Sequence, residues 1–299
     1  MVDKHIDVDR YKIKQNETVN LHNIPTFCDI AIEKNEVKQE LFPAVIHEMK
    51  SWQEKLYAEK KYGLTFVLQA MDAAGKDSTI NHVFSELNPS GLFVKSFKEP
   101  TSLESSHDYL WRIHKALPAR GEIVIFNRSQ YEEVIVTRVH QLLEKESFPT
   151  SLITNHIWEE RYEQIMHWEK YLAQNGFPMI KIFLHVSKKE QEKRLIDRIS
   201  RPEKNWKLAF SDISERKYWN KYQEYYEELL SKTPTSYAPW YIVPADDKWY
   251  TRYVVACIVV KELRKLNPSF PTLDSHVEEQ LKQLKTLLEQ GQIYKVMED

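Results

Sequence analysis

Cysteine is scarce in this chain of 299 residues, which contains only Cys28 and Cys257, far apart in the sequence. Two distant cysteines provide neither a disulfide framework nor a CxxC metal or redox pair, so the sequence favours a protein of the reducing cytosol. An excess of charge is also missing, because 42 Lys and Arg residues stand against 44 Asp and Glu residues, a formal net charge of -2. We therefore expect no general attraction to nucleic acid or to anionic lipid, and any anion-binding site must be local.

Long hydrophobic segments are missing too. The longest apolar run, 254–260, lies between Arg252 and Lys261 and is far too short to cross a bilayer. The opening residues MVDKHIDVDRYK contain no apolar core of the kind found in a signal peptide. We therefore expect a cytoplasmic protein without a membrane partner. Hydrophobic residues make up 42% of the chain, which places it outside disordered compositions, so we expect it to fold.

Several familiar catalytic motifs do not occur in the sequence. It contains no HExxH or Cys/His cluster for zinc, no G-x-S-x-G nucleophile elbow and no G-x-G-x-x-G dinucleotide turn. The 11 histidines are dispersed, and His82 and His114 lie on expected helices, where a structural role is more common than a catalytic one. These absences argue against zinc hydrolases, serine hydrolases and dinucleotide-dependent enzymes.

What the sequence does contain is an alternation of apolar runs and amphipathic segments. Short, nearly continuous apolar runs predict strands at 64–69, 92–97, 122–126, 179–186 and 240–243. Helical periodicity predicts helices over 33–61, around 80–87, over 103–117, over 151–175 and near the end of the chain. This alternation predicts an α/β fold with a parallel sheet built from βαβ units. The sequence has no internal repeat and no flexible linker, so we expect one domain.

The segment AMDAAGKDS, residues 70–78, joins the first expected strand to the following helix. Gly75 and Lys76 stand where a Walker A loop has its Gly-Lys pair, in the context where backbone N–H groups bind phosphate. Ala70 stands at the first Gly of that motif and Asp77 at its Ser/Thr, so the segment alone fits an ordinary turn with a surface lysine equally well. The candidate phosphate-binding residues are Ala73, Ala74, Gly75, Lys76, Asp77 and Ser78.

Two carboxylates accompany this loop. Asp72 within it and Asp77 just after it would repel phosphate unless a divalent cation lay between them, which predicts Mg²⁺ with Asp72 as its ligand. Asn127 and Arg128 follow the third expected strand at the carboxyl edge of the sheet, where open α/β sheets bind ligands. We expect Asn127 to contribute to nucleotide or phosphate binding and Arg128 to face the phosphates. For Arg128, a capping or salt-bridging role is the ordinary alternative.

Residues 188–207 form a basic stretch on this mildly acidic chain, with eight Lys or Arg residues, four acidic residues and a local balance of +4. Arg194, Arg198 and Arg201 recur at helical spacing on one face, where they would repel one another without an anion. Pro202 then ends the helix and leaves the cations that follow on a loop able to close over a phosphate site. A solvated face neutralised by neighbouring acids is the alternative.

Five segments, in this order, resemble the polyphosphate kinase 2 family. They are LQAMDAAGKDSTINHVFSELNPSG, GEIVIFNRSQYEEVIVTRVH, FLHVSKKEQEKRLIDRI, RPEKNWKLAFSDISERKYWNKYQEYYEELLSKT and APWYIVPADDKW. The similarity runs from about residue 55 to 266 and is more specific than the phosphate loop alone. Asn127 stands where many members have Asp, so a metal-binding Asp is not carried over to it, and this form resembles the subgroup that phosphorylates both AMP and ADP.

The resemblance implies a P-loop kinase core, a three-layer αβα fold with a central parallel sheet and a helical lid. It implies direct phosphoryl transfer from inorganic polyphosphate to AMP or ADP, with ATP among the nucleotides bound. Lys76, Arg128 and Arg138 would offset the charge of the transferring group, and Asp72 would hold Mg²⁺ and orient the acceptor. A track of cations for polyphosphate is expected from Arg194, Arg198, Lys204 and Lys207, joined by Lys95 and Lys98. Glu132 and Glu133 are candidates to bind a second metal or the acceptor; exposed helix carboxylates are the alternative.

We expect a single kinase domain over 1–299, with a lid at about 199–232 and a C-terminal helical extension at 268–299. The polar, weakly periodic N-terminal segment, 1–45, is expected as an arm laid over the domain rather than as part of its core. Self-association as a dimer or tetramer is expected from the family and from an apolar stripe on a charged helix, unless that stripe packs on its own core. The stripe consists of Val277, Leu281, Leu284 and Leu288. The alternative functions are an ATP-dependent nucleotide kinase of the thymidylate kinase type and a phosphate- or polyphosphate-binding protein without turnover.

Overall fold

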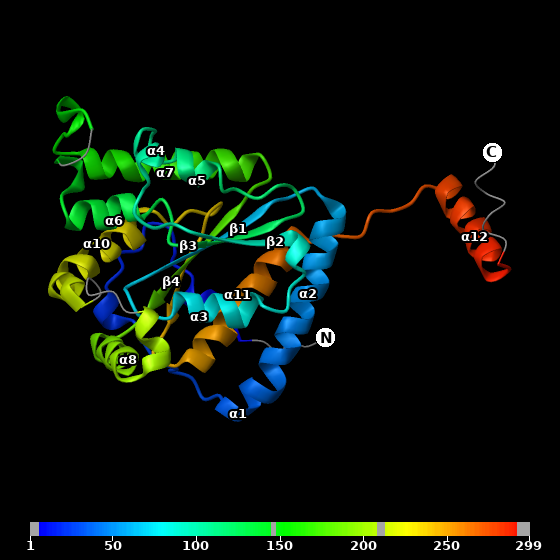
Figure 1. The fold of residues 1–299 in the computed structure, drawn as a ribbon, viewed down its shortest axis with the longest axis horizontal. Helices are drawn as coiled ribbons and strands as arrows, with labels where there is room; N and C mark the ends of the chain where they lie inside the picture. The colour runs from blue at the N-terminus through cyan, green and yellow to red at the C-terminus, as the bar shows by residue number, and fades with distance from the viewer. Residues whose placement is uncertain (1–5, 145–147, 208–212, 292–299) are drawn as a thin grey trace.

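The computed structural model describes residues 6–144, 148–207 and 213–291 (Figure 1). Its centre is a sheet of five parallel strands in the order β2-β3-β1-β4-β5. The strands are β1 (Leu64–Ala70), β2 (Leu92–Ser96), β3 (Ile123–Asn127), β4 (Met179–His185) and β5 (Trp240–Pro244). All five lie where the apolar runs predicted them, so the predicted parallel sheet is confirmed.

The continuous apolar runs arise because the central strands are buried on both faces. Phe66 and Ile125 point into the larger core cluster, whereas their neighbours Val67 and Phe126 point into a second cluster on the other face of the sheet. Side chains alternate across a strand, so a strand covered on both sides needs apolar residues at consecutive positions. The edge strand β2 is different: from Phe93 to Ser96 its side chains are exposed.

Helices cover both faces of the sheet (Figure 1). On one face α2 (Phe42–Glu59), α3 (Lys76–Phe84) and α11 (Lys248–Leu266) pack together; on the other lie α6 (Glu132–Val139), α7 (Ile157–Gln174) and α10 (Trp219–Lys232). The helix α8 (Lys188–Ser200) follows β4, and α1 (Lys34–Glu36) runs through a π-helical turn (Val37–Leu41) into α2. This three-layer arrangement confirms the predicted fold class. Among the described residues, no helix has the length and apolar character needed to cross a membrane.

Two helix predictions were wrong in extent. The expected helix 103–117 is two short helices, α4 (Ser102–Ser105) and α5 (Trp111–His114). Between them, side chains take over hydrogen bonds that a continuous helix would make: the Ser106 hydroxyl donates to the carbonyl of Leu103, and the Asp108 carboxylate accepts the N–H of Leu110. The helix expected over 151–175 begins only at Ile157, after a separate 3-10 turn (Thr150–Leu152).

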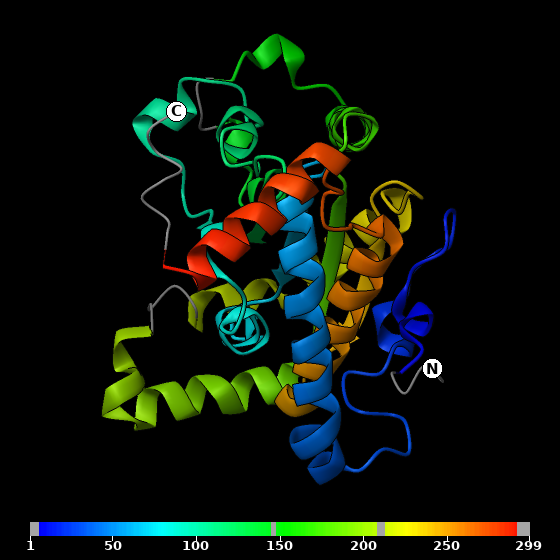
Figure 2. The same ribbon diagram turned by 90° about the vertical axis from the view of Figure 1, so that its right-hand side faces the viewer.

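The N-terminal arm was expected outside the core, and this was wrong. Its buried apolar residues belong to the main core cluster, and Lys12 forms an antiparallel bridge with Tyr241 at the outer edge of β5. The arm includes the 3-10 turns η1 (Val8–Tyr11) and η2 (Leu21–Asn23), and η1 packs against β5 and α11 (Figure 2). Covering that edge protects unpaired backbone groups from other strands. The buried arm residues are Val8, Tyr11, Ile13, Val19 and Leu21.

The region predicted as a lid divides into two parts. The 3-10 helices η7 (Pro202–Lys207) and η8 (Glu215–Tyr218) lie beyond α8, while α10 buries Trp219, Tyr226 and Leu229 in the core. Residues 208–212 of the predicted lid lie outside the described residues, and closure of this region over the cleft stays a prediction. The C-terminal extension contains α12 (Ser275–Glu289), which stands away from the body of the molecule and has no buried residue (Figure 1). The remaining 3-10 turns are Pro89–Gly91 and Leu142–Glu144.

Candidate active site

The loop between β1 and α3 lines a cleft of about 920 Å³. Two of its residues, Ala73 with φ 60° and Gly75 with φ 108°, have left-handed backbones, and α3 begins directly after Gly75. This places a tight turn at a helix N-terminus, the arrangement that favours phosphate binding. All six phosphate-binding candidates, residues 73–78, line the cleft.

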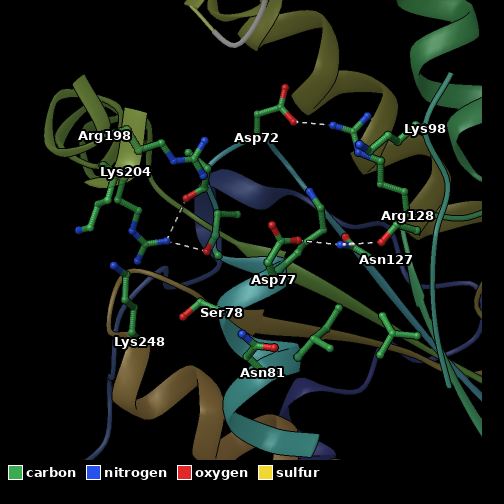
Figure 3. A pocket seen from close by; sticks show the side chains of 18 of the residues that line it. Asp72, Asp77, Ser78, Asn81, Lys98, Asn127, Arg128, Arg198, Lys204 and Lys248 are labelled. Carbon is green, nitrogen blue, oxygen red and sulfur yellow. Dashed lines mark hydrogen bonds and ion pairs between the residues drawn. The ribbon is translucent and has the colours of Figure 1, made fainter. Parts of the chain in front are cut away.

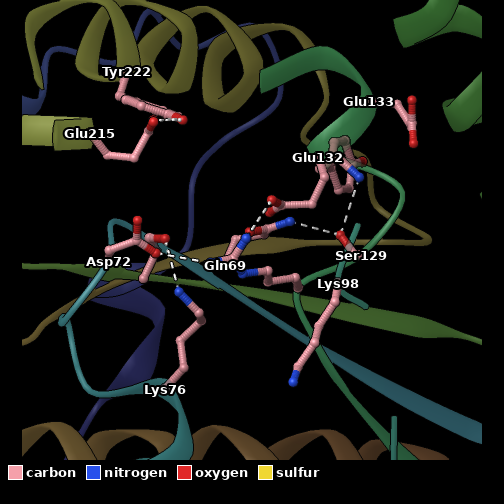
Figure 4. Close-up of polar contacts among 12 residues, drawn as sticks. Gln69, Asp72, Lys76, Lys98, Ser129, Glu132, Glu133, Glu215 and Tyr222 are labelled. Atoms are coloured by element: carbon pink, nitrogen blue, oxygen red, sulfur yellow. Dashed lines mark hydrogen bonds and ion pairs between the residues drawn. The ribbon is translucent and has the colours of Figure 1, made fainter. Parts of the chain in front are cut away.

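The side chain of Lys76 extends from the start of α3 back toward the end of β1 (Figure 4). Its Nζ donates a hydrogen bond to the carbonyl oxygen of Ala70 at 3.0 Å. Burial, and after it the positive charge of Arg128, lowers the pKa of Lys76, while the carboxylates of Asp72 and Glu132 oppose this shift. Burial has removed water from this lysine, so an anion that binds beside it stabilises its charged form.

Arg128 and Asp72 form an ion pair at the centre of the site, with Nη2 and Oδ1 2.9 Å apart (Figure 3). Arg128 follows β3 in a left-handed conformation, φ 68°, which is costly for a residue with a side chain. It also lies 3.4 Å from the carboxylate of Glu132, whose pKa is raised by burial against the opposing effect of Arg128. The strained backbone thus directs one guanidinium toward two carboxylates of the site.

The residues that follow Arg128 are anchored in the protein interior. Ser129 is fully buried and accepts a hydrogen bond from the side chain of Gln69 on β1, 3.0 Å away (Figure 4). Tyr131 donates to the carboxylate of Glu169, which forms a buried ion pair with Lys181 at 2.7 Å. These contacts fix the chain on the C-terminal side of Arg128 and help to hold its left-handed conformation.

Asn127 connects the end of β3 to the phosphate loop. Its side-chain amide donates to the carboxylate of Asp77 at 2.7 Å and lies 3.5 Å from the hydroxyl oxygen of Ser96 on β2. The two candidates identified separately from the sequence are therefore direct partners. Asp77, which stands at the Ser/Thr position of a Walker A loop, thus accepts a hydrogen bond from the end of the neighbouring strand β3.

Positive side chains line the cleft on both sides of the loop carboxylates (Figure 3). Arg198, Lys204 and Lys248 contribute from one side, and Lys98 and Arg128 from the other. Lys204 is ion-paired with Asp197, which also lines the cleft. Trp206 lines the same wall with 79% of its surface exposed. Lys207 ends η7, and its side chain lies outside the part of the chain that the structure describes.

Three predicted residues lie elsewhere. Arg138 is not among the residues lining the cleft, because its guanidinium pairs with Glu228 on α10 at 2.7 Å and lies over the ring of Tyr225.

Glu133 faces away from Glu132 along α6, and its carboxylate lies close to two arginines of the interior, Arg112 and Arg161. Lys95 alternates with the cleft-lining residues Val94 and Ser96 along β2, so it points to the other side of the strand.

The structure also brings in residues that the sequence analysis missed. Lys248 begins α11 directly after the loop that follows β5, and burial followed by the nearby charges of Arg194 and Lys204 lowers its pKa. The motif ADDKW contained a usable signal, because it follows a strand at the carboxyl edge of the sheet. A small hollow of about 30 Å³ shares Asp72 and Arg128 with the cleft and continues past them; it is further lined by Glu132, Gln191, Glu215, Arg216, Tyr222 and Tyr226, among others.

The carboxylates of the cleft suit a magnesium ion shared with a substrate. Among the described residues, no three His, Cys, Asp or Glu side chains form a group that could hold a metal ion by themselves. Magnesium is commonly bound through one or two carboxylates together with substrate phosphates. Asp72 and Asp77 provide two such carboxylates on either side of Lys76, so the residues present fit this mode of binding.

Comparison with known proteins identifies relatives over most of the chain. The family model of polyphosphate kinase 2 (PPK2) matches residues 31–271. An ADP-polyphosphate phosphotransferase of Rhodopseudomonas palustris is 40% identical over 285 residues, 95% of this chain and 99% of that protein. An AMP/ADP-polyphosphate phosphotransferase of Meiothermus ruber is 46% identical over 219 residues, 73% of this chain and 78% of that protein. The crystal structure of polyphosphate kinase 2 from Arthrobacter aurescens TC1 aligns with TM-score 0.82 and 35% identity, covering 91% of this chain and 95% of that one.

Proposed function

The chain belongs to the polyphosphate kinase 2 family, and we propose that it transfers a phosphoryl group from inorganic polyphosphate directly to both AMP and ADP, with Mg²⁺ as cofactor. Polyphosphate-dependent phosphorylation of a nucleotide follows from this membership. Our proposal adds that both AMP and ADP are acceptors, that Mg²⁺ is the cofactor, and that particular residues have the roles given below. The observation that carries them is the cleft itself, in which a phosphate loop with an ion pair of Arg128 and Asp72 adjoins a wall of cations.

Charge neutralisation is the main contribution that this chain makes to the transfer. Phosphoryl transfer needs little covalent chemistry from the protein, and positioned positive groups lower the barrier by stabilising charge on the transferring group. Lys76 and Arg128 both line the cleft, and the hydrogen bond of Lys76 to Ala70 and the ion pair of Arg128 with Asp72 hold both side chains in place. We assign them to the transferring phosphoryl group.

Asp72 and Asp77 would hold magnesium together with substrate phosphates. When bound, the ion would neutralise phosphate charge between these carboxylates. Asp72 lies between the cleft and the small hollow behind it, so its carboxylate also suits the orientation of the acceptor phosphate. Its pairing with Arg128 keeps it directed toward the same region.

The polyanionic donor would follow the cationic wall of the cleft. Arg198, Lys204 and Lys248 lie on one side of the loop and could neutralise several consecutive phosphates, which a single nucleotide does not require. The acceptor would then approach from the side of Asp72 and Arg128.

A single reaction tests the proposed activity. The protein is incubated with AMP, Mg²⁺ and polyphosphate in the absence of ATP, and the nucleotides are separated. We expect ADP and then ATP to form, and ADP supplied alone to yield ATP. Product that forms only when ATP is the donor would identify an ATP-dependent nucleotide kinase. Binding of polyphosphate without any product would identify a binding protein.

We also propose that the protein self-associates in the cytoplasm through the apolar stripe of α12. Leu281 and Leu288 are exposed on this helix, and in the described part of the chain nothing buries them. Two copies of the stripe could cover each other. Sedimentation at micromolar concentration should show a species larger than the monomer, which Leu281→Asp should dissociate. A monomer at all concentrations would contradict the proposal.

A further inference from the structure

Arg194 is engaged by protein groups at every nitrogen of its guanidinium. Nε donates to Glu190 at 2.9 Å, Nη1 to the carbonyls of Ala73 and Ala74 at 3.3 and 2.6 Å, and Nη2 to the carbonyls of Ala245 and Asp246 at 2.6 and 3.0 Å. These contacts use all five N–H donors that a guanidinium has. The side chain is buried, with 7% of the residue exposed. Arg194 therefore has no donor left for a phosphate.

A second side chain of α8 extends this contact. Gln191, one turn before Arg194, donates from Nε2 to the carbonyl of Asp72 at 2.9 Å. Together the two side chains bind the carbonyl oxygens of three successive loop residues, 72 to 74. In a trans peptide the N–H points opposite to the carbonyl, so the N–H groups of Ala73 and Gly75 are turned away from these α8 side chains.

This contact supports a loop that is strained by itself. The left-handed conformations of Ala73 and Gly75 persist only where surrounding contacts determine them. Arg194 supplies such contacts, because it donates hydrogen bonds to the carbonyls of Ala73 and Ala74. A Cβ atom added at Gly75 would lie 3.5 Å from Nη1 of Arg194, so the guanidinium packs directly against the turn. A cation on the carbonyls also strengthens the N–H groups of the same peptides as donors to an anion.

The contacts of Arg194 and Gln191 with the loop form a brace, and Arg194 connects this brace to distant parts of the chain. Asp246, whose carbonyl accepts from Arg194, uses its carboxylate to accept the N–H of Ser187 and the hydroxyl of Thr26, each at 2.8 Å. Thr26 lies in the N-terminal arm, and Ser187 is the N-cap of α8. The phosphate loop is thereby connected to the end of β5, to α8 and to the arm.

We propose that Arg194, assisted by Gln191, is a positioning residue that sets the conformation of the phosphate loop and makes no contact with polyphosphate. The proposal rests on the function proposed above for the same cleft. It assigns Arg194 a role different from that of Arg198, one turn further along α8, although the two are equivalent by sequence pattern. Replacing Arg194 should therefore slow the transfer step rather than weaken the capture of the polyanion.

The test compares Arg194→Met with Arg198→Met, and uses Lys193→Met, with 78% of its side chain exposed, as the matched control on the same helix. Three quantities are measured: kcat, KM for polyphosphate over a range of salt concentrations, and hydrogen exchange of amides 72–78 in the substrate-free protein. We expect Arg194→Met to lower kcat by about a hundredfold, to leave the salt dependence of KM unchanged, and to accelerate exchange in the loop. Arg198→Met should instead raise KM and reduce its salt dependence.

Two results would overturn the proposal. If Arg194→Met changes KM and its salt dependence as Arg198→Met does, Arg194 contacts the anion directly. If the variant melts at a lower temperature but has unchanged kcat and loop exchange, its role is general stability. Should Arg194→Met fail to fold, Arg194→Lys and Gln191→Met carry the same test, because each removes only part of the brace. Hydrogen exchange needs no substrate, so a wild-type protein without polyphosphate activity would refute the proposed function while leaving the brace measurable.

Discussion

The side-chain amide of Asn127 donates a hydrogen bond to the carboxylate of Asp77, with nitrogen and oxygen 2.7 Å apart. The pair connects the carboxyl end of β3 to the first turn of α3 within the cleft (Figure 3). An aspartate at position 127, as in many family members, would place a second carboxylate against Asp77. The amide therefore removes a charge repulsion that would otherwise require a cation.

We predict that Asn127→Asp lowers activity at low Mg²⁺ and that added Mg²⁺ restores part of it, because a divalent cation would screen the two carboxylates. Initial rates measured across a magnesium series at saturating polyphosphate check this. The double variant Asn127→Asp with Asp77→Asn reverses donor and acceptor and should recover more activity at low Mg²⁺ than the single variant. Identical magnesium curves for wild type and Asn127→Asp would rule out the repulsion.

Lys76→Ala should reduce kcat by about a hundredfold or more while the protein still folds, because a cation directed at the transferring group is lost. The substitution removes the hydrogen bond that Lys76 donates to the carbonyl of Ala70. Steady-state kinetics and a thermal melt are measured together, with Lys193→Ala as the control. A variant that melts normally and keeps wild-type turnover would place the transferring group elsewhere.

Removal of magnesium should abolish transfer, and Asp72→Asn should weaken the response to it. The substitution keeps the size of the side chain but removes the charge that pairs with Arg128 at 2.9 Å. Rates are measured in excess chelator and then on titration with Mg²⁺, and the variant should need a higher concentration for half-maximal rate. Full activity of the wild-type protein in chelator would contradict a metal requirement.

The affinity for polyphosphate should fall steeply with salt, while that for AMP should fall less, because binding of a long polyanion releases many counterions. Arg198→Glu and Lys204→Glu should each raise KM for polyphosphate more than KM for AMP, since both line the cationic wall. KM for both substrates is measured at several salt concentrations. Equal salt slopes, with charge reversals that leave polyphosphate KM unchanged, would show that the donor enters by another route.

Stability should decrease when the pH falls from about 6.5 toward 4, in part because of His185. This residue ends β4, and burial lowers its pKa to about 4 against the opposing charge of Asp246, with His22 nearby. The unfolded chain binds a proton on this histidine near pH 6.5, whereas the folded protein keeps the histidine neutral. Its contribution to the free energy of unfolding, up to about 3 kcal/mol, is therefore present above pH 6.5 and is lost as the pH falls toward 4. Denaturant unfolding between pH 7 and 4.5 should show a smaller pH dependence for His185→Gln than for wild type or for the exposed control His47→Gln. Equal slopes for all three proteins would contradict the assignment.

The strands and the phosphate loop could be predicted from the sequence because their signals are local. A strand covered on both faces requires consecutive apolar residues, and the turn at Gly75 requires a residue that tolerates a positive φ. The order of the motifs carried the family resemblance, and with it the expectation of a polyphosphate-dependent kinase. The strands, the loop and each single motif depend on residues that are close together in the chain.

The roles of individual charged side chains were decided only by the tertiary structure. Arg194 and Arg198 lie one turn apart with the same chemistry and both line the cleft, yet the N–H groups of Arg194 donate to Glu190 and to the carbonyls of the phosphate loop and of the segment after β5. Arg138 is likewise held by Glu228, 90 positions further along the chain. A long charged side chain is satisfied by whatever partner the fold brings within hydrogen-bond distance, and those partners come from segments far apart in sequence. Local periodicity therefore determined where the helices and strands form, while packing between distant segments determined which partners each charged side chain meets.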